Sequence, residues 1–476
     1  MKQIITIAGR SFFLLLLLGV FTLAAAEKPK YVFLFIGDGM AAAQRTAAEA
    51  FSLSMGKGKL AINHFPYLAP TATCSISPVT DSAAAATALA CGVKTRNGRI
   101  GMDVSGTKNL ESIAYVARKN GKKVGILTSV TINHATPAGF YAHRTNRSLY
   151  YEIGLDLIAS SFDYFVGGGF GKNDDKKSPL YKGDLYKLAK DAGYTVIVGD
   201  AKAFKALKKG AGKVIAAGGK RALPYAISGN KNVPSLADYT AKGIELLDNP
   251  NGFFMMVEGG SIDSFGHAND AGGNVLETIE FDKAVRVAVA FAEKHPEETL
   301  IVVTGDHETG GMDLGAPGSS APLNAGILKH QKKAFVTLQW ALKKEVAKDK
   351  NYDFEKCKAF MRKYLEFRFA SDKLTRENEK FLPISREEEA KLLKAFLGEF
   401  GRETKTASAD KKKVKKTNFI TELRIFFNGK AGIRWNTAGH TARPVLTTSM
   451  GVGAKQFSGK LDNTEIAIKL KALMQK

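Results

Sequence analysis

Short runs of apolar residues alternate along this chain with longer stretches in which apolar and polar residues mix at helical spacing. Residues 31–36 form the clearest run, and apolar side chains there at nearly every position are typical of a strand buried on both faces. Similar runs occupy residues 123–128, 194–198, 253–257 and 300–304. The stretches that favour helices are residues 82–90, 110–119, 236–247 and 275–294. This alternation predicts an α/β fold with a mostly parallel central sheet covered by helices on both faces.

The pattern changes near Ala316. From about residue 327 to residue 416 the chain is rich in Lys, Glu, Ala and Leu, which favours helices. We therefore expect one α/β domain over residues 27–476 that carries a mostly helical, lysine-rich insertion, or cap, at about residues 316–418. A strand over residues 418–427 is expected to return to the core, and a helix over residues 462–475 to close it.

The first residues have the composition of a secretion leader. Lys2 and Arg10 flank the start of an apolar run at residues 12–20, and three alanines at residues 24–26 form a small-residue cleavage site. The run is short for a membrane span, and a polar segment follows it directly. We expect a signal peptide over residues 1–26 and a mature protein exported to the periplasm or the extracellular space. The alternative is an uncleaved membrane anchor.

Composition indicates a globular chain, with 45% hydrophobic and 24% charged residues, and argues against a disordered or polytopic membrane protein. The formal net charge is +23, which favours anionic partners such as phosphorylated substrates, envelope surfaces or nucleic acid. Solvated lysines account for most of this charge, so we expect no specific nucleic acid partner. The run at residues 411–416 is interpreted as a solvated loop, with a docking patch for polyanions as the alternative.

The chain has three cysteines, Cys74, Cys91 and Cys357. An exported protein can join two of them in a disulfide, but buried free thiols fit their apolar surroundings at least as well. They form no CxxC motif, so they do not indicate a zinc or redox site.

Acidic residues and histidines follow several predicted strands. Asp38 stands between two glycines, and Asp306 and His307 follow shortly after the run at residues 300–304. Because the carboxyl ends of parallel strands meet in one crevice, we expect these side chains to gather there. Asp263 and His267 are spaced to share a helical face, so they can chelate one metal ion. Taken singly, each of these residues is more often an ordinary turn or structural residue.

Ser82 begins an alanine-rich helix. A serine at a helix start is most often an N-cap, whereas a serine oxygen close to a cation there would become a nucleophile. The motif alone favours the cap. Arg147 has the fork that matches two phosphate oxygens, although alone it fits a surface residue equally well.

Together these motifs resemble the alkaline phosphatase family. The serine motif at residues 80–88 and the block from Glu258 to His267 are its most specific parts, and the resemblance extends from about Tyr31 to Val445. It implies a metal-dependent phosphomonoesterase that acts on small phosphate monoesters through a phosphoserine intermediate and releases inorganic phosphate. Members of the family are commonly homodimers, which leaves a homodimer open for this chain.

The resemblance also implies two Zn²⁺ ions, one Mg²⁺ ion and their ligands. One zinc ion would be bound by Asp263, His267 and His440. The second would be bound by Asp38, Asp306 and His307, with the Ser82 oxygen joining during catalysis. The magnesium ion would be bound by Asp38, Thr136 and Glu258. Ser82 would attack phosphorus, and Arg147 would bind the phosphate.

At two positions the chain departs from the best-studied bacterial members. Those members carry Asp where this chain has His134 and Lys where it has Ser264. Losing the aspartate weakens the support of the magnesium ion, and losing the lysine removes an indirect contact to phosphate. Metal preference and pH optimum are therefore left open.

Three other functions compete with this interpretation. Sulfatases of the same superfamily use a cysteine-derived nucleophile in a CxPxR context, which neither Cys74 nor Cys91 has. A phosphodiesterase of the superfamily often carries threonine as its nucleophile, and Arg147 favours the doubly charged end of a monoester. A non-enzymatic polyanion-binding protein is supported only by the lysine run at residues 411–416.

Overall fold

The structure is a computed structural model that describes residues 28–229, 232–315, 322–401 and 418–475. The expected signal peptide and the lysine run at residues 411–416 lie outside the described residues. Among the described residues, no helix has both the length and the apolarity required to cross a bilayer.

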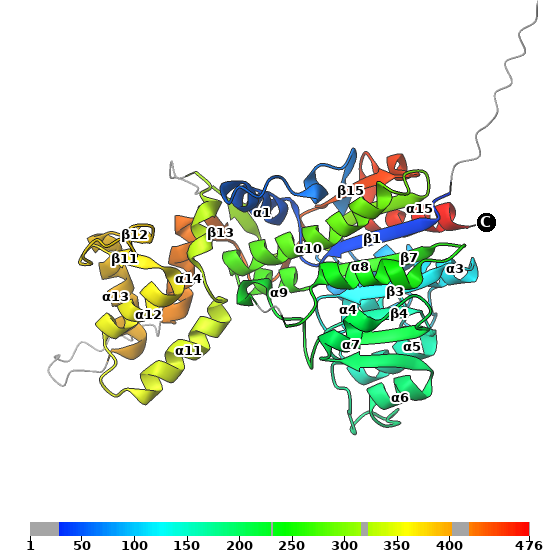
Figure 1. The fold of residues 1–476 in the computed structure, drawn as a ribbon, viewed down its shortest axis with the longest axis horizontal. Coiled ribbons are helices and arrows are strands. Elements are labelled where there is room, and N and C mark those ends of the chain that lie inside the picture. Colours follow the sequence, from blue (N-terminus) through cyan, green and yellow to red (C-terminus); the bar gives the residue numbers. More distant parts are fainter. Residues whose placement is uncertain (1–27, 230–231, 316–321, 402–417, 476) are drawn as a thin grey trace, which may run out of the picture.

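A ten-stranded sheet lies at the centre of the molecule (Figure 1). From one edge to the other its strands are β16 (Leu461–Asp462), β2 (Tyr67–Ala72), β15 (Val445–Gly451), β8 (Thr299–Gly305), β1 (Tyr31–Gly37), β7 (Phe253–Gly259), β3 (Lys123–Thr128), β4 (Tyr164–Gly167), β6 (Lys213–Ala217) and β5 (Tyr194–Val198). The strands from β8 to β5 run parallel to one another, whereas β15 is antiparallel to both of its neighbours. The predicted α/β fold with a mostly parallel central sheet is confirmed.

The strand β1 is buried on both faces, which explains its unbroken apolar run. Phe33 and Phe35 belong to the core on one side of the sheet, and Leu34 and Ile36 belong to the core on the other side. The helices that cover the sheet on the side of the first core include α1 (Ala42–Ser54), α7 (Ala201–Ala206), α8 (Leu236–Leu247) and α10 (Ala271–Ala292), and this core continues into the helices that follow residue 330. Those that contribute to the second core are α2 (Ser82–Cys91), α3 (Ile113–Lys119), α4 (Ala135–Ala138), α5 (Tyr150–Ser160), α6 (Leu185–Asp191) and α15 (Asn463–Met474).

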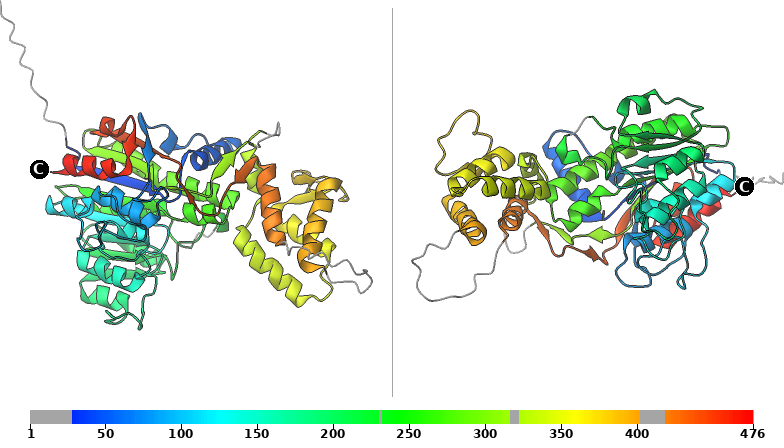
Figure 2. Two further views of the ribbon diagram at one scale, coloured as in Figure 1. Left: turned by 180° about the vertical axis from the view of Figure 1, so that it is seen from behind. Right: turned by 90° about the horizontal axis from the view of Figure 1, so that it is seen from below.

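A mostly helical lobe flanks one end of the sheet, coloured yellow to orange in Figure 1 and seen from two further sides in Figure 2. Its elements are α11 (Phe335–Lys348), α12 (Phe354–Leu365), β11 (Phe367–Phe369), β12 (Leu382–Ile384), α13 (Arg386–Phe400) and α14 (Phe419–Lys430). The chain leaves the core through β10 (Met312–Leu314) and returns through β13 (Ile433–Trp435), and these two strands pair antiparallel.

The predicted strand over residues 418–427 is wrong, because this segment forms the helix α14. Asn418 caps the helix by accepting a hydrogen bond from the Thr421 backbone N–H at 3.2 Å. Phe419, Leu423 and Phe427 are four residues apart and all three are buried. The apolar period of this segment is therefore helical, and its aromatic and branched residues had suggested a strand. The predicted closing helix at residues 462–475 is confirmed as α15, which Asp462 caps.

All three cysteines are free thiols, and Cys91 and Cys357 are buried. The interpretation as free thiols is therefore the one that fits this structure. Burial raises the pKa of the Cys91 thiol to about 12, so it stays protonated at neutral pH.

A buried arginine ties the first helix to the edge of the sheet. Arg45 of α1 is 1% exposed. Its guanidinium donates to the Leu446 carbonyl at 2.9 Å, to the Thr448 hydroxyl at 2.9 Å and to the Ile62 carbonyl. Ile62 lies in the 3-10 helix η1 (Ala61–Asn63), so one side chain joins α1, η1 and β15.

We predict that Arg45→Ala destabilises the fold by about 3 kcal/mol or more, because two buried carbonyls lose their charged donor. Thermal and denaturant unfolding would measure this loss. The matched control is Lys202→Ala on an exposed face of α7, for which a change within about 0.5 kcal/mol is expected. Equal stability of the two variants would contradict the role of Arg45.

Candidate metal centre

Three buried acids lie at the carboxyl ends of neighbouring strands. Asp38 follows β1, Glu258 lies near the end of β7 and Asp306 follows β8, and each is fully buried. The parallel register pairs Gly37 of β1 with Gly259 and with Gly305, which brings the three acids to one level of the sheet. The crevice expected from the strand pattern therefore exists, and its lining is acidic.

Ser82 is the first residue of α2, but it does not cap that helix. Asp81 is the N-cap, since its carboxylate accepts the Ala84 N–H at 3.0 Å. The Ser82 hydroxyl lies instead 3.2 Å from His307 Nε2, and the residue is 1% exposed. The capping interpretation of Ser82 is thus wrong. The free N–H groups at the start of α2 leave its hydroxyl oxygen in a position that favours negative charge.

Asp263, His267 and His440 form the most open of the three metal-ligand groups, and their ligand atoms lie within 4.8 Å of one another. Asp263 and His267 come from the helix α9 (Ser261–His267), whereas His440 comes from the strand β14 (His440–Thr441) beyond the lobe. His267 Nδ1 donates to the Ala438 carbonyl at 2.6 Å, and His440 Nδ1 donates to the Thr80 carbonyl at 2.9 Å. Both Nε2 lone pairs therefore face the same point, 3.1 Å apart.

Asp38, Asp306 and His307 surround a second point. His307 Nε2 lies 3.4 Å from Asp38 Oδ1 and 3.2 Å from Asp306 Oδ2. Asp38 and His307 also group with Asp263, which places this point beside the first. Thr309 donates its hydroxyl hydrogen to Asp263 at 2.6 Å and so accepts one from His307 Nδ1 at 3.1 Å. This relay leaves His307 Nε2 as a free ligand atom.

A third group gathers on the other side of Asp38. It contains Asp38, His134 and Glu258, whose ligand atoms lie within 4.8 Å of one another. The Thr136 hydroxyl lies 3.3 Å from Asp38 Oδ2, and the Thr128 hydroxyl donates to Glu258. The four predicted positions of this region thus lie together, with His134 beside the carboxylates.

Several buried ligand atoms lack a hydrogen-bond partner. Within the described part of the chain these atoms include Asp38 Oδ1, Glu258 Oε1, Asp306 Oδ2 and His134 Nδ1. Buried polar atoms of this kind are rare in folded proteins unless a ligand or an ion completes them. Mixed imidazole and carboxylate donors suit zinc, and oxygen donors suit magnesium, so the donor set fits divalent cations.

Without a cation, burial dominates the protonation of this centre. It raises the pKa of Glu258 to about 7 and that of Asp306 to about 8, and it raises the pKa of Asp38 well above the usual range. Burial also lowers the pKa of His134 to about 3 and that of His307 well below its usual range. A cation bound here would favour the ionised form of these acids, and the neutral imidazoles could then bind it together with the carboxylates.

Arg147 reaches the centre from the loop before α5. Its guanidinium donates to Asp81 at 3.1 Å and lies 3.4 Å from His134 Nε2. Its side chain is 27% exposed, so one side of the fork remains accessible. Ser264 is exposed on α9, between Asp263 and His267. The structure therefore brings the predicted residues of the centre into one place.

The sequence analysis missed the residues that hold these side chains in position. Glu308 accepts hydrogen bonds from Gln44 Nε2 at 2.8 Å and from the Gly311 N–H at 3.0 Å, which shapes the loop after Asp306. Asp81 lies inside the serine motif at residues 80–88 and Thr309 lies two residues after His307, so proximity in the chain could have suggested both. Thr128 carries no such signal, because only the sheet brings it to Glu258.

Comparison with known proteins gives a consistent result. The family model for alkaline phosphatase matches residues 29–476. Alkaline phosphatase 4 of Bacillus subtilis is 33% identical over 408 residues, which cover 82% of this chain and 75% of that protein. The crystal structure of a cold-active alkaline phosphatase from Shewanella sp. superposes with a TM-score of 0.75 at 27% identity, covering 94% of this chain and 100% of that one.

A further solved structure is a variant of the alkaline phosphatase from the Antarctic bacterium TAB5 in which one histidine is replaced by glutamate, with magnesium bound in its M3 site. It has a TM-score of 0.65 and 27% identity, and it covers 94% of this chain and 99% of that chain.

We predict that the metal-free protein loses stability as pH rises from about 4 to about 8. The folded-state pKa values of Glu258 and Asp306 are raised to about 7 and 8, so the folded protein keeps protons that the unfolded chain has already released. Deprotonation therefore favours the unfolded state across this window. Melting temperatures of chelated protein at several pH values would measure the effect.

Restoring zinc and magnesium should raise the melting temperature and flatten its pH dependence, because bound cations stabilise the ionised carboxylates. In the chelated state Asp306→Asn should also show a weaker decline with pH than the unmodified protein. The same pH slope in both chelated proteins would contradict this assignment of the buried charge.

Proposed function

This chain belongs to the alkaline phosphatase family and is a phosphoric monoester hydrolase, and from this premise we propose that it is exported and hydrolyses small phosphate monoesters through a phosphoserine at Ser82. The observation that carries the proposal is the position of the Ser82 hydroxyl. Asp81 caps α2 in its place, and the hydroxyl faces His307 Nε2 at 3.2 Å, beside the acidic crevice. The leader pattern of residues 1–26 supports export.

The metal complement that we propose is two zinc ions and one magnesium ion. Asp263, His267 and His440 would hold one zinc ion, and Asp38, Asp306 and His307 the other. Asp38, Thr136 and Glu258 would hold magnesium. The unpartnered atoms of Asp38, Glu258 and Asp306 support these assignments. Bound there, the cations would supply Lewis acidity, lower the pKa of the Ser82 hydroxyl and offset the charge of the phosphate.

His134 is proposed to adjust the third of these sites. Its ring lies in one group with Asp38 and Glu258, so it stands close enough to contact or border a cation there. The related alkaline phosphatase from TAB5 holds magnesium in its M3 site when one of its histidines is replaced by glutamate. The neutral imidazole of His134 should bind magnesium less tightly than a carboxylate would.

The protein groups divide the work of phosphoryl transfer between them. Arg147, fixed by Asp81, orients the phosphate by donating to two of its non-bridging oxygens. The start of α2 favours the developing negative charge on the Ser82 oxygen. The Ser82 hydroxyl gives up its proton to water and its oxygen forms the new bond to phosphorus. The bond to the alcohol oxygen breaks on the opposite side, and the leaving oxygen takes up a proton from water. Water then cleaves the phosphoserine and releases inorganic phosphate.

The exposed Ser264 leaves no cationic side chain at its position, so the bound product is held by Arg147 and by whatever cations are present. A monoester dianion uses both donors of the arginine fork, whereas a diester presents a single charge. This difference separates the proposed activity from that of a phosphodiesterase. We also propose that the segment at about residues 316–418 forms a cap on the α/β domain, as the lobe beside the sheet suggests.

We predict that Ser82→Ala lowers turnover of a simple aryl phosphate by about a thousandfold or more, because the nucleophile is lost. The melting temperature should hardly change, since Asp81 supplies the cap. Phosphate release with and without chelator, together with the intact mass of protein quenched during turnover, would measure both effects. Undiminished turnover in the variant, or phosphate attached elsewhere, would refute the assignment.

Ser112→Ala is the matched control for this substitution. Ser112 is a buried serine that caps α3, with its hydroxyl 3.4 Å from the Tyr115 N–H. Its loss should cost about 1 kcal/mol of stability and leave turnover intact. Ser82→Ala should therefore lose activity but keep its stability, whereas Ser112→Ala should lose stability but keep its activity.

We predict that Arg147→Ala weakens monoester hydrolysis more than diester hydrolysis. The change removes two charge-assisted contacts, worth about 1.5–3 kcal/mol each before any compensation by cations or water. Values of kcat/KM for an aryl phosphate and its methyl ester would be compared, with Arg96→Ala on an exposed loop as the control. Equal losses for both substrates would show that Arg147 does not recognise the dianion.

A further inference from the structure

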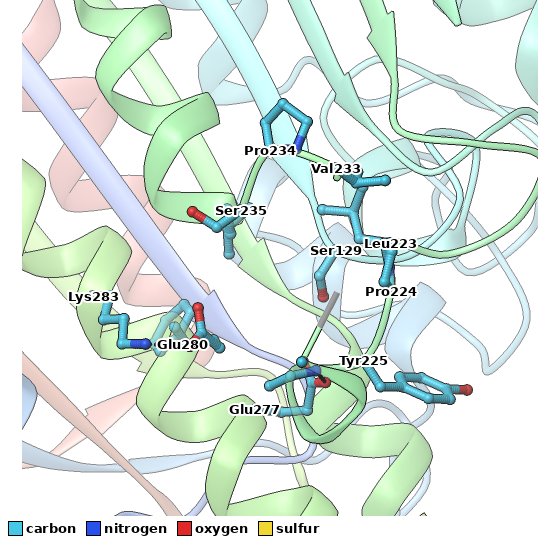
Figure 3. Close-up of a pocket in the computed structure, with 14 residues that line it drawn as sticks. Ser129, Leu223, Pro224, Tyr225, Val233, Pro234, Ser235, Glu277, Glu280 and Lys283 are labelled. Atoms are coloured by element: carbon cyan, nitrogen blue, oxygen red, sulfur yellow. Dashed lines mark hydrogen bonds and ion pairs between the residues drawn. The ribbon is translucent and has the colours of Figure 1, made fainter. Parts of the chain in front are cut away.

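A cavity of about 290 Å³ lies away from the acidic crevice, on the face of the sheet that α8 and α10 cover (Figure 3). Its walls come from the loop after β6, which contains the 3-10 helix η2 (Ala226–Ser228), and from the start of α8, the middle of α10 and the end of β3. None of the residues assigned to the metal centre lines it. The cavity is therefore a separate site.

The cavity wall combines apolar side chains with the charged residues Glu277, Glu280 and Lys283. The apolar residues include Leu223, Val233, Leu236 and Phe281. The apolar part of this wall can contact the hydrocarbon body of a small organic molecule. The wall alone, however, does not select one ligand class.

Glu277 is the buried carboxyl residue of the cavity wall. Glu277 of α10 is 8% exposed, and its Oε1 accepts a hydrogen bond from the Ala226 N–H at 2.8 Å. Figure 3 shows Glu277, Ser129 and Tyr225 around the same space. Burial raises the pKa of Glu277 to about 8, because its surroundings disfavour the carboxylate form. A cation placed beside this carboxyl would recover its charge.

The protein itself supplies no cation to Glu277 in the part of the chain that the structure describes. Lys283 is the cationic residue among the lining side chains, and its ammonium group pairs with Glu280. Glu277 also stands apart from every group of His, Cys, Asp and Glu side chains that could hold a metal ion, again among the described residues. Of the two carboxyls in the wall, Glu280 is paired with Lys283, which leaves the buried Glu277 without a cation among the described lining residues. One such carboxyl is better matched to an ammonium group than to a divalent cation, which prefers several oxygen ligands.

We propose that this cavity binds a small organic amine, with its ammonium group on Glu277 and its apolar body against Leu223, Val233 and Phe281. The ligand belongs to the class of primary alkyl or arylalkyl amines, which combine one positive charge with a hydrocarbon body. This site does not depend on the proposed function, because nothing in it requires turnover.

Two residues of the cavity wall connect it to the metal centre. Ser129 lines the cavity, accepts the Ser261 N–H on its hydroxyl at 3.1 Å and donates its own N–H to the Glu258 carbonyl at 3.1 Å. Tyr225 lines the cavity as well and packs edge-on against Phe265 of α9, at 4.7 Å between ring centroids. An amine bound here would lie against the two contacts that support Glu258 and α9.

The test is a titration of the full-length, metal-loaded protein with benzylamine, followed by calorimetry or ligand-observed NMR. Saturating inorganic phosphate is present throughout, so that the crevice at Ser82 is occupied. We expect one saturable site with a Kd of about a millimolar, as is usual for a ligand of this size. Benzyl alcohol, which has the same body without the charge, should bind about tenfold more weakly.

Glu277→Gln preserves the shape of the side chain and its hydrogen bond from Ala226, and it should weaken benzylamine binding about tenfold or more. Glu293→Gln, an exposed glutamate at the end of the same helix, is the matched control and should bind as the unmodified protein does. Val233→Trp fills the cavity from the loop side and should abolish binding even if Glu277→Gln folds poorly.

Two results would overturn the proposal. One is a titration of the unmodified protein that shows no saturation well above the millimolar range, which would mean that Glu277 only anchors η2. The other is benzylamine binding that survives both Glu277→Gln and Val233→Trp, which would place the amine elsewhere on the protein.

Discussion

The mutual repulsion of buried carboxylates is the constraint on which the rest of this structure depends. Asp38, Glu258 and Asp306 are fully buried at one edge of the sheet, with half-buried Asp263 beside them. In a medium of low polarity such a group of acids is stable only when protonated or when cations lie between them. The unpartnered oxygen atoms at three of these acids face the points where cations would bind. The register of the strands, the start of α2 and the loop after Asp306 hold these acids close together, although their burial opposes ionisation.

Single side chains support several parts of the metal centre at once, which makes the centre compact. Asp81 caps α2 and thereby leaves the Ser82 hydroxyl free, and the same carboxylate holds Arg147 at 3.1 Å. Thr309 connects His307 to Asp263 through one hydroxyl. The glycine at position 39 has a φ of +73°, and a Cβ atom there would lie 2.9 Å from the Asp263 backbone. Only glycine fits where these two segments approach each other.

The lobe has a direct consequence for the centre, although its helices lie beside the sheet. Its two connections, β10 and β13, pair with each other, so the chain returns close to where it left. A few residues later β14 pairs with β9 (Glu308–Thr309), opposite His307's own loop. His440 is delivered by this pairing, and its ring stacks on His307 with 3.7 Å between centroids. The pairing of the two connections therefore lets a long insertion stand between His307 and His440 while the two rings stay in contact.

The sequence by itself determined the class of fold and the identity of most chemical groups. An unbroken apolar run such as residues 31–36 fits a strand covered on both sides, and glycine-flanked acids after such runs indicate the carboxyl edge of a parallel sheet. These conclusions were available because side-chain periodicity and turn chemistry are local properties. Local reasoning failed at α14, where branched and aromatic residues suggested a strand, and at Ser82, where helix position suggested a cap that Asp81 provides.

Only the tertiary structure decided which groups meet. The contact between His267 and His440, the approach of Thr128 to Glu258 and the hydrogen bond from Thr309 to Asp263 join positions that no local rule connects. The cavity around Glu277 is of the same kind, since the sequence shows only a glutamate on a long helix. Distances between residues remote in the chain follow from how the sheet and helices pack. Packing depends on how many side chains fit together at once, and the spacing of residues within one motif carries no information about that fit.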